Sequence, residues 1–466
     1  MSAVAPVRSL DPPLNDDVLG LIVFKADLRD PEQKLASWNE DDYTPCSWNG
    51  VKCHPRTNRV TELNLDGFSL SGRIGRGLLQ LQFLHKLSLS NNNLTGIINP
   101  NMLLSLVNLK VVDLSSNGLS GSLPDEFFRQ CGSLRVLSLA KNKLTGKIPV
   151  SISSCSSLAA LNLSSNGFSG SMPLGIWSLN TLRSLDLSRN ELEGEFPEKI
   201  DRLNNLRALD LSRNRLSGPI PSEIGSCMLL KTIDLSENSL SGSLPNTFQQ
   251  LSLCYSLNLG KNALEGEVPK WIGEMRSLET LDLSMNKFSG QVPDSIGNLL
   301  ALKVLNFSGN GLIGSLPVST ANCINLLALD LSGNSLTGKL PMWLFQDGSR
   351  DVSALKNDNS TGGIKKIQVL DLSHNAFSGE IGAGLGDLRD LEGLHLSRNS
   401  LTGPIPSTIG ELKHLSVLDV SHNQLNGMIP RETGGAVSLE ELRLENNLLE
   451  GNIPSSIKNC SSLRSL

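Results

Sequence analysis

Five basic residues in the last quarter of the chain have types that suit the recognition of an anionic group. They are His374, His395, Arg398, His422 and Arg443. An unperturbed imidazole titrates near ~6.5, so the three histidines would gain positive charge in a mildly acidic compartment. Ordinary surface variation would explain these residue types, and a polar, slightly basic recognition patch is the hypothesis that we carry forward. A metal site is not expected, because single side chains on separate segments rarely converge at ligand distance.

A second and weaker candidate set consists of Arg189, Arg213 and Arg215. The sequence gives no support for catalysis, because it contains no nucleophile–base pairing, no metal-ligand cluster and none of the kinase motifs G-x-G-x-x-G, H-R-D and D-F-G. We therefore expect neither an enzyme activity nor a cofactor in this chain.

A sequence repeat defines the elements that must position these residues. An asparagine recurs every 24 or 25 residues within the frame L-x-L-x-x-N-x-L-x-G or a close variant, with one longer step. The fifteen asparagines are Asn92, Asn117, Asn142, Asn166, Asn190, Asn214, Asn238, Asn262, Asn286, Asn310, Asn334, Asn375, Asn399, Asn423 and Asn447. This spacing is typical of a leucine-rich-repeat solenoid, an α/β-type, right-handed superhelical coil with a concave parallel β-sheet. Such sheets usually bind other molecules, so we expect an extended binding surface.

One coil illustrates the expected role of each position. Leu137 and Leu139 are two residues apart and point to the same side of a short strand. Leu144 and Ile148 turn inward on the following bends, and the coil buries these groups by stacking on its neighbours. Asn142 follows the strand, where its carboxamide can bond backbone groups on its own and the neighbouring coil. We assign the asparagines no ligand role.

The residue between the two inward positions of each strand faces outward. It is often an aspartate, for which we expect a solvated or neighbour-bonding role. These aspartates are Asp113, Asp186, Asp210, Asp234, Asp282, Asp330, Asp371 and Asp419. The five basic residues named first should project towards the same concave surface.

The segment before the first repeat has the features of a cap. Residues Asn15 to Leu28 are predicted to form a helix, with Asn15 as its N-cap and Asp16 and Asp17 in its first turn. Cys46 and Cys53 bracket a short loop, and a disulfide would stabilise a small cap that has no core of its own. We therefore expect an N-terminal disulfide-stapled helical cap.

The other six cysteines are predicted to be free, buried thiols that act as small apolar fillers. They are Cys131, Cys155, Cys227, Cys254, Cys323 and Cys460. Cys131 and Cys155 occupy the same position in neighbouring coils, so a bridge between them is the alternative. Their spacing excludes a C-x-x-C metal or redox motif.

Five N-x-[ST] triplets are candidate glycosylation sites, and unmodified chance matches are the alternative. They are Asn93, Asn162, Asn306, Asn359 and Asn459. Asn162 and Asn306 each lie between two inward residues, so a glycan there would block access to the concave sheet at those two coils.

These features predict a division of the chain. Residues 1–13 are a residual leader or a disordered N-terminus, 14–59 the cap, 60–454 sixteen coils, and 455–466 the start of a truncated seventeenth repeat. An insertion falls near 346–366, where a polar Gly/Ser-rich stretch lengthens one repeat. It is interpreted either as part of the binding face or as a merely tolerated loop. Because no closing cap follows Leu466, we expect a longer parent protein.

Composition excludes two classes of partner. The formal net charge is −5 and aromatics make up 4 % of residues, which does not support nucleic-acid binding. No run approaches eighteen consecutive apolar residues, so no membrane insertion is expected within these residues.

The L-S-G-x-[IL]-P repeat ending, together with Trp38 and the segment Cys46-Ser-Trp-Asn-Gly-Val-Lys-Cys53, resembles the ectodomain of plant leucine-rich-repeat receptor-like kinases. The resemblance covers about residues 14 to 466 and is nearest to the inflorescence-and-root-apices and PXY-correlated type. It implies a cell-surface receptor that enters the secretory pathway, with its repeats on the extracellular side of the plasma membrane. It also implies one membrane helix and a cytoplasmic kinase or pseudokinase domain in the parent protein. The partners implied are a peptide or protein ligand and a co-receptor.

Many peptide-sensing members of that family carry an R-x-R pair on the inner sheet that binds a peptide's C-terminal carboxylate. The matching triplet here is Glu441-Leu442-Arg443, with an acid in the first place. Arg213-Asn214-Arg215 has the required letters but flanks the repeat asparagine. The family's carboxylate-binding pair therefore does not carry over to this chain.

The leading functional prediction is ligand recognition for a cell-surface receptor. The alternatives are a receptor-like protein without a kinase and a secreted inhibitor of cell-wall-degrading enzymes, which plants build from similar repeats. Such inhibitors tend to have about ten coils and a closing cap. Sixteen coils, an insertion and an open end favour the receptor.

Overall fold

The computed structural model describes residues 16–341, 344 and 364–466. They form two compact units that divide between Glu193 and Gly194. The leader predicted at 1–13, the helix N-cap Asn15, the glycosylation candidate Asn359 and most of the insertion predicted at 346–366 lie outside the described residues.

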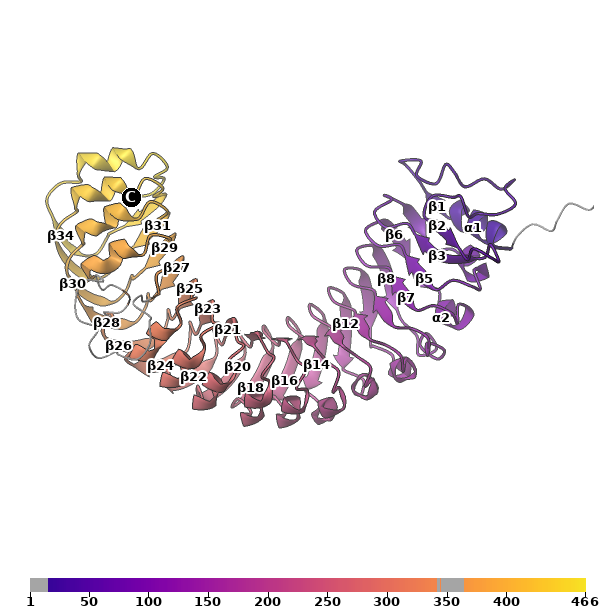
Figure 1. Ribbon diagram of the computed structural model, residues 1–466, viewed down its shortest axis with the longest axis horizontal. Coiled ribbons are helices and arrows are strands. Elements are labelled where there is room, and N and C mark those ends of the chain that lie inside the picture. The colour runs from indigo at the N-terminus through magenta and orange to yellow at the C-terminus, as the bar shows by residue number, and fades with distance from the viewer. Residues whose placement is uncertain (1–15, 342–343, 345–363) are drawn as a thin grey trace, which may run out of the picture. The chain divides into compact units, whose positions relative to one another are not determined.

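Each unit contains two parallel sheets. The one built from the short L-x-L strands is called the first sheet (Figure 1). In the first unit its strands are β3 (Val60–Asn64), β5 (Lys86–Ser88), β7 (Val111–Asp113), β9 (Val136–Ser138), β11 (Ala160–Asn162) and β13 (Ser184–Asp186). In the second unit they are β15 (Ala208–Asp210), β17 (Thr232–Asp234), β19 (Ser256–Asn258), β21 (Thr280–Asp282), β23 (Val304–Asn306), β25 (Ala328–Asp330), β27 (Val369–Asp371), β29 (Gly393–His395), β31 (Val417–Asp419) and β33 (Glu441–Arg443). Leu329 pairs directly with Leu370, so the ladder continues in register across the longest step of the repeat.

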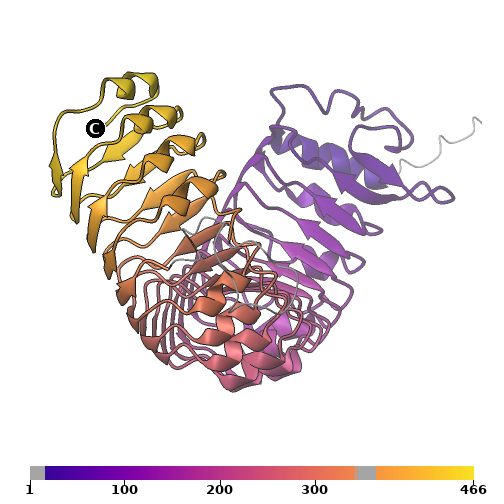
Figure 2. The same ribbon diagram turned by 60° about the vertical axis from the view of Figure 1, so that its left-hand side comes forward.

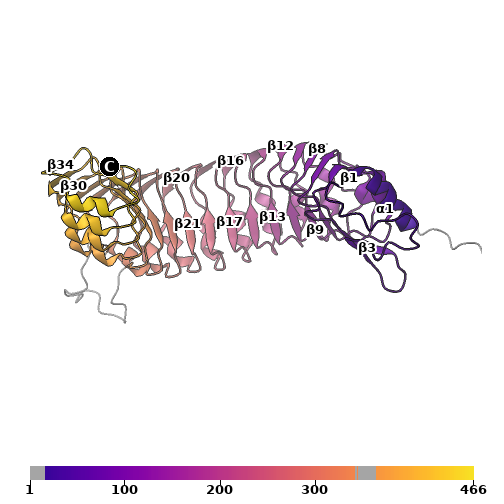
Figure 3. The same ribbon diagram turned by 90° about the horizontal axis from the view of Figure 1, so that it is seen from above.

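The repeat ending forms a second parallel sheet, where the sequence predicted only bends. In the first unit it contains β4 (Ser71–Arg73), β6 (Asn93–Gly96), β8 (Gly118–Ser122), β10 (Lys143–Gly146), β12 (Gly167–Ser171) and the start of β14 (Glu191–Glu195). In the second unit it contains β16 (Arg215–Pro219), β18 (Ser239–Gly242), β20 (Ala263–Glu267), β22 (Lys287–Gln291), β24 (Gly311–Gly314), β26 (Ser335–Lys339), β28 (Ala376–Gly379), β30 (Ser400–Pro404), β32 (Gln424–Met428) and β34 (Leu448–Glu450). Figure 3 shows the two sheets of the second unit as separate rows, with β17 and β21 in one and β16 and β20 in the other. The repeat glycine takes a positive φ at the end of the second strand, for example 81° at Gly146, a conformation that costs glycine little.

A single helical turn completes most coils and leads back to the first sheet. Most of these turns follow a proline, whose fixed φ suits the residue before a helix, as at Pro293. In the first unit the turns are η1 (Arg76–Gln80), α2 (Met102–Ser105), η2 (Val150–Ser154) and η3 (Ile176–Ser178). In the second unit they are η4 (Glu198–Arg202), η5 (Ser222–Ser226), η6 (Asn246–Gln250), η7 (Lys270–Glu274), η8 (Asp294–Asn298), η9 (Val318–Asn322), η10 (Ala383–Asp387), η11 (Ser407–Glu411), η12 (Arg431–Gly435) and η13 (Ser455–Asn459). Figure 2 shows strands and helical turns of the last coils as distinct rows.

The core confirms the predicted solenoid. Leu281 and Leu283 of one coil are fully buried, and their counterparts in the other complete coils are buried except Leu444 in the last one, which is half-buried. The asparagines have the predicted structural role. The Asn262 Nδ2 donates to the carbonyl oxygens of Leu235, Leu259 and Gly260 at 3.0, 3.1 and 3.3 Å, and its Oδ1 accepts from the Leu240 amide at 3.0 Å. Each asparagine of this kind satisfies backbone groups on its own coil and on the preceding one.

The cap closes the edge of both sheets in the first unit. Helix α1 (Asp16–Ala26) is shorter than predicted, because Leu28 lies in strand β1 (Leu28–Arg29), which pairs antiparallel with β4. Strand β2 (Val51–Cys53) pairs antiparallel with β3, and the predicted disulfide joins Cys46 to Cys53. The edge strands of the first coil therefore have hydrogen-bond partners rather than unpaired backbone groups.

The prediction of free thiols is wrong for Cys131 and Cys155, which form a disulfide with a Cα–Cα distance of 4.7 Å. Stacking places equivalent residues of neighbouring coils one strand spacing apart, which is within disulfide range. The prediction is confirmed for Cys227, Cys254, Cys323 and Cys460, which are free and buried. Burial raises the pKa of Cys227 and of Cys323 to about 11 and that of Cys254 to about 12, so these thiols are poor nucleophiles.

Two buried threonines, Thr320 and Thr433, have a hydroxyl without a hydrogen-bond partner among the described residues. Thr320 is fully buried where other coils have isoleucine, as at Ile296. Replacing Thr320 by valine should raise the free energy of unfolding by about 1–2 kcal/mol, because the change removes an unsatisfied buried hydroxyl. Denaturant unfolding measures the effect. Thr408→Val is the control and should lower stability, because the Thr408 hydroxyl donates to the Ala383 carbonyl at 2.7 Å. Equal effects of the two changes would contradict this explanation.

Candidate functional site

The outward face of the first sheet in the second unit is the candidate site. In Figure 1 its strands β21 to β31 lie along the inner side of that unit's curve. The residues that lie between the two inward positions of each strand form a row across the sheet, which we call the strand row. In the last four coils the register places Asp371 beside His395, His395 beside Asp419, and Asp419 beside Arg443. The strand row therefore alternates acidic and basic side chains at this end of the unit.

Three other predicted residues form a second row, the turn row, immediately after the strands. His374, Arg398 and His422 have φ of 52°, 53° and 53°. Their amides bond to the next coil: that of His374 to the Ser397 carbonyl at 2.8 Å, and that of Arg398 to the Ser421 carbonyl at 3.0 Å. Asn446 continues the row, and its Nδ2 lies 3.2 Å from the His422 Nε2. Stacking therefore brings these side chains together along one edge of the strand row.

The exposure of the five basic residues differs. His374, Arg398 and Arg443 are exposed, whereas His395 and His422 are half-buried. The His395 ring lies close to Gly393, and its Nε2 is 3.4 Å from the place that a Cβ of residue 393 would occupy. Arg443 is partly neutralised by its own strand, because its Nη2 lies 2.8 Å from the Glu441 carboxylate. The side chain best placed to attract an anion is therefore Arg398, with His374 and His422 on either side of it.

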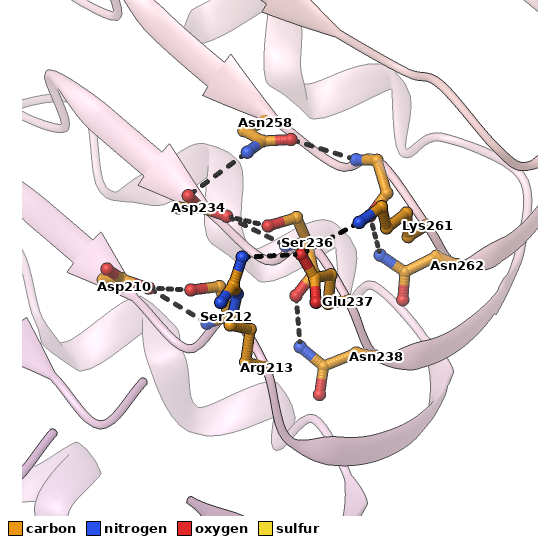
Figure 4. A network of polar contacts seen from close by, with 11 residues as sticks. Asp210, Ser212, Arg213, Asp234, Ser236, Glu237, Asn238, Asn258, Lys261 and Asn262 are labelled. Carbon is orange, nitrogen blue, oxygen red and sulfur yellow. Dashed lines mark hydrogen bonds and ion pairs between the residues drawn. The ribbon is translucent and has the colours of Figure 1, made fainter. Parts of the chain in front are cut away.

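The aspartates of the strand row bond to their own coil, as predicted. The Asp234 Oδ1 accepts from the Ser236 amide at 3.0 Å and from its hydroxyl at 2.6 Å, and Asp210 and Ser212 repeat the arrangement (Figure 4). Asn258 extends the row by donating to the Asp234 Oδ2 at 3.2 Å. These carboxylates hold the turn after each strand and also give the strand row a negative charge in the earlier coils of the second unit.

The weaker candidate set occupies different positions in the two units. Arg189 belongs to the first unit, Arg213 is on the turn row of the second unit, and Arg215 begins β16 in the second sheet. Arg213 and Lys261 both pair with Glu237, at 3.0 and 3.2 Å (Figure 4). The Lys261 hydrogen bond, helped by Arg213, lowers the pKa of the Glu237 carboxyl. Arg213 is therefore already engaged with an acid, which weakens it as a ligand-binding residue.

The glycosylation candidates occupy three kinds of position. Asn93 begins β6 and Asn459 ends η13, and both are exposed. Asn162 and Asn306 are half-buried on the strand row, where each Oδ1 accepts from the hydroxyl of the serine two residues later at 2.7 Å. The carboxamides of Asn162 and Asn306 thus have the same turn-holding role as the aspartates.

Among the described residues no group of three or more histidine, cysteine or acidic side chains is arranged to hold a metal ion, and no helix has the length and apolarity needed to cross a membrane. A pocket of about 440 Å³ lies over η11, η12 and η13, beside Glu411 and Arg431. None of the predicted basic residues lines it.

The N-terminal segment and the repeats match leucine-rich-repeat families. Residues 14–54 match the leucine rich repeat N-terminal domain and residues 168–289 a leucine-rich repeat region. Further leucine rich repeat matches cover 83–103, 108–168, 301–323, 325–346, 366–388 and 389–449.

Two Arabidopsis thaliana proteins are similar to part of the chain. The leucine-rich repeat receptor-like protein kinase PXC2 is 69% identical over 98 residues, which is 21% of this chain and 10% of that protein. The probably inactive leucine-rich repeat receptor-like protein kinase At3g28040 is 67% identical over 86 residues, 18% of this chain and 8% of that protein. The matched segments thus span about a tenth of the length of these relatives.

Solved receptor structures are similar over nearly the whole chain. The Arabidopsis receptor kinase HAESA ectodomain, in complex with an N-terminally extended IDA peptide hormone, gives a TM-score of 0.81 at 34% identity, covering 97% of this chain and 77% of that one. A TDR receptor gives 0.79 at 31% identity, covering 88% and 68%. HAESA with IDA and the co-receptor SERK1 gives 0.64 at 30% identity, covering 97% and 89%.

Proposed function

Because this chain belongs to the family of plant leucine-rich-repeat receptor kinase ectodomains, we propose that it is the ligand-recognition region of a cell-surface receptor kinase. It binds a peptide or protein ligand on the outward face of the first sheet and acts on the extracellular side of the plasma membrane, after passage through the secretory pathway. The observation that carries the proposal is the likeness, over 97% of the chain, to a receptor ectodomain described with a peptide hormone.

The last coils of the second unit are the part of this face that we assign to the ligand. Arg398, flanked by His374 and His422, offers an anionic group of the ligand a charge-assisted hydrogen bond beside a strand row that includes His395. Arg443 is a weaker anchor, because Glu441 already accepts from its guanidinium. The ligand's acidic group is therefore placed near the turn row rather than at the Glu441–Arg443 strand.

A co-receptor is included among the partners. HAESA is described with both IDA and SERK1, and this chain resembles that complex's receptor over 97% of its own length. Glycan attachment at the five candidate asparagines and ligand contact by the five basic residues remain predictions.

Peptide selection tests the proposal directly. A random peptide library displayed on phage is panned on the immobilised 466-residue chain, and enriched peptides are synthesised and measured by calorimetry. Peptides that bind the proposed face should lose about tenfold in affinity with His395→Ala/Arg398→Ala, because a hydrogen bond to a charged group is worth roughly 1.5–3 kcal/mol. The control is Arg431→Ala/Lys458→Ala, which removes two exposed cations from η12 and η13 and should leave affinity unchanged.

Two results would overturn the proposal. One is that no enriched peptide binds the chain in solution. The other is that the enriched peptides respond to the control variant and not to the change at His395 and Arg398.

A further inference from the structure

A row of cationic side chains runs along one edge of the first sheet in the first unit, outside the face assigned to the ligand. Each member lies two positions before the first inward residue of its strand. In successive coils these residues are His85, Lys110, Arg135, Ala159 and Arg183. We call this set the edge row.

The backbone fixes the spacing of the edge row. The amide of Lys110 donates to the His85 carbonyl at 2.8 Å, and the amide of Arg135 to the Lys110 carbonyl at 2.8 Å. The ladder continues through Ala159, at 2.8 Å, to Arg183, at 2.7 Å. Neighbouring members are therefore one strand spacing apart, about 4.8 Å. Lys110, Arg135 and Arg183 are exposed, so their charged groups are available to a partner.

The charges of the edge row are not neutralised by the protein. None of its cationic members has an ion-pair partner among the residues that the structure describes. Some equivalent positions of the second unit differ, because there Lys303 pairs with Glu279 at 2.7 Å and Arg464 with Glu440 at 3.6 Å. Arg207 and Lys231, at the start of that unit, are exposed like the first-unit cations. At this position of the repeat, cations in part of the second unit are therefore paired with acids, whereas the cations of the first unit are not.

One further observation supports an electropositive edge. Lys86 is adjacent to His85 and begins β5, which adds a cation beside the row. Partial burial and then the positive charge of Lys110 lower the pKa of the His85 imidazole, so Lys110, Arg135 and Arg183 supply most of the row's charge. Exposed like charges held this close repel one another, and a bound polyanion would remove that repulsion.

We propose that the edge row binds a linear polyanion made of uronic acid sugars. Such a chain carries one carboxylate on every ring, so it presents closely spaced negative charges to Lys110 and Arg135 on neighbouring coils and to Arg183 two coils further on. An extended acidic peptide is a poorer match, because side chains on one side of a strand recur about every 6.6–6.8 Å, compared with the strand spacing of about 4.8 Å. The outward neighbours Val111 and Val136 are small and half-buried, which leaves a sugar ring free to approach. Only the placement of this ligand outside the cell rests on the proposed function.

Binding of a galacturonic acid oligomer to the 466-residue chain tests this proposal. The variant is Lys110→Gln/Arg135→Gln/Arg183→Gln, measured by calorimetry at low ionic strength. Its affinity should be about tenfold or more below that of the unchanged chain. Affinity of the unchanged chain should also fall as salt is added, because exposed charges are screened.

The matched control is Lys270→Gln/Lys287→Gln/Lys339→Gln, which removes three exposed cations from the second unit. Its affinity should stay within about twofold of that of the unchanged chain. Both variants change exposed side chains only, so an unaltered melting temperature shows that they are folded.

Three outcomes would overturn the proposal. Equal affinity of the edge-row variant and the unchanged chain would exclude this row as the binding site. Equal binding of a fully methyl-esterified oligomer would exclude recognition by charge. Tight binding of a glutamate oligomer without binding of the uronate oligomer would identify an acidic peptide as the partner. Each outcome is distinct from failure of the proposed function, because peptide binding is tested with variants of the second unit.

Discussion

Replacing Asp17 by alanine should lower the free energy of unfolding of the first unit by about 3–5 kcal/mol, the usual effect of removing one partner from a buried ion pair. The Asp17 side chain is 0% exposed and joins the cap to the first coil. It accepts from the Arg59 Nε and Nη2 at 3.0 and 2.8 Å and from the Val60 amide at 2.7 Å. The alanine variant removes the acceptor shared by a guanidinium group and a buried amide. The Asp17 contact raises the pKa of Arg59. The guanidinium also stays charged after Asp17 is removed, because arginine is not deprotonated in proteins.

Hydrogen exchange at the Val60 amide measures the effect better than a single unfolding curve, because long repeat arrays need not unfold in one step. Asp16→Ala is the control: Asp16 is exposed at the same end of the helix and should have an effect below about 0.5 kcal/mol. The double variant Asp17→Ala/Arg59→Leu should be more stable than Asp17→Ala alone, because no buried charge is left unpaired. If the Val60 amide is equally protected from exchange in the Asp17→Ala and Asp16→Ala variants, the ion pair does not hold the cap in place.

This contact shows what the sequence alone did not provide. Asp17 was interpreted as a helix-terminal acid, a local role that any acid in the first turn fulfils. Its actual partner is 42 residues away in the chain, and no periodic pattern connects the two residues. Contacts inside the repeat are different, because each residue meets its equivalent about 24 positions away and the pattern itself identifies the neighbour. The first-sheet strands and the asparagine ladder were therefore predictable.

The errors inside the repeat have a different cause. The bridge between Cys131 and Cys155 follows from the stacking geometry, but a buried cysteine and a bridged one occupy the same position and are equally apolar. The second sheet was missed because the segment around Leu144 was interpreted as bends, although it forms a strand, β10, that ends at a glycine with a positive φ. On the candidate face, the sequence identified the outward basic residues but not the split between the strand row and the turn row. That split depends on the left-handed conformation of His374, Arg398 and His422.

Replacing Asn286 by alanine should destabilise the middle of the second unit by about 3 kcal/mol, because several buried backbone groups lose their partner together. The Asn286 Nδ2 donates to the carbonyls of Leu259, Leu283 and Ser284 at 3.0, 3.1 and 3.0 Å. Its Oδ1 accepts from the Leu264 amide at 3.0 Å. The effect should be confined to the neighbouring coils, since each repeat of a solenoid contacts only its neighbours.

Hydrogen exchange measured coil by coil tests both the size and the range of this effect. Protection of the Leu264 amide should fall most, while coils near β31 and β33 keep their protection. Asn298→Ala is the matched control, because Asn298 is exposed at the end of η8 and should change stability by less than about 0.5 kcal/mol. Asn286→Asp separates the hydrogen bonds from packing: it keeps the side-chain shape but places a carboxylate without N–H donors against three carbonyl oxygens. It should therefore destabilise at least as much as alanine, and an aspartate variant as stable as the unchanged chain would show that the donated hydrogen bonds do not hold the coils together.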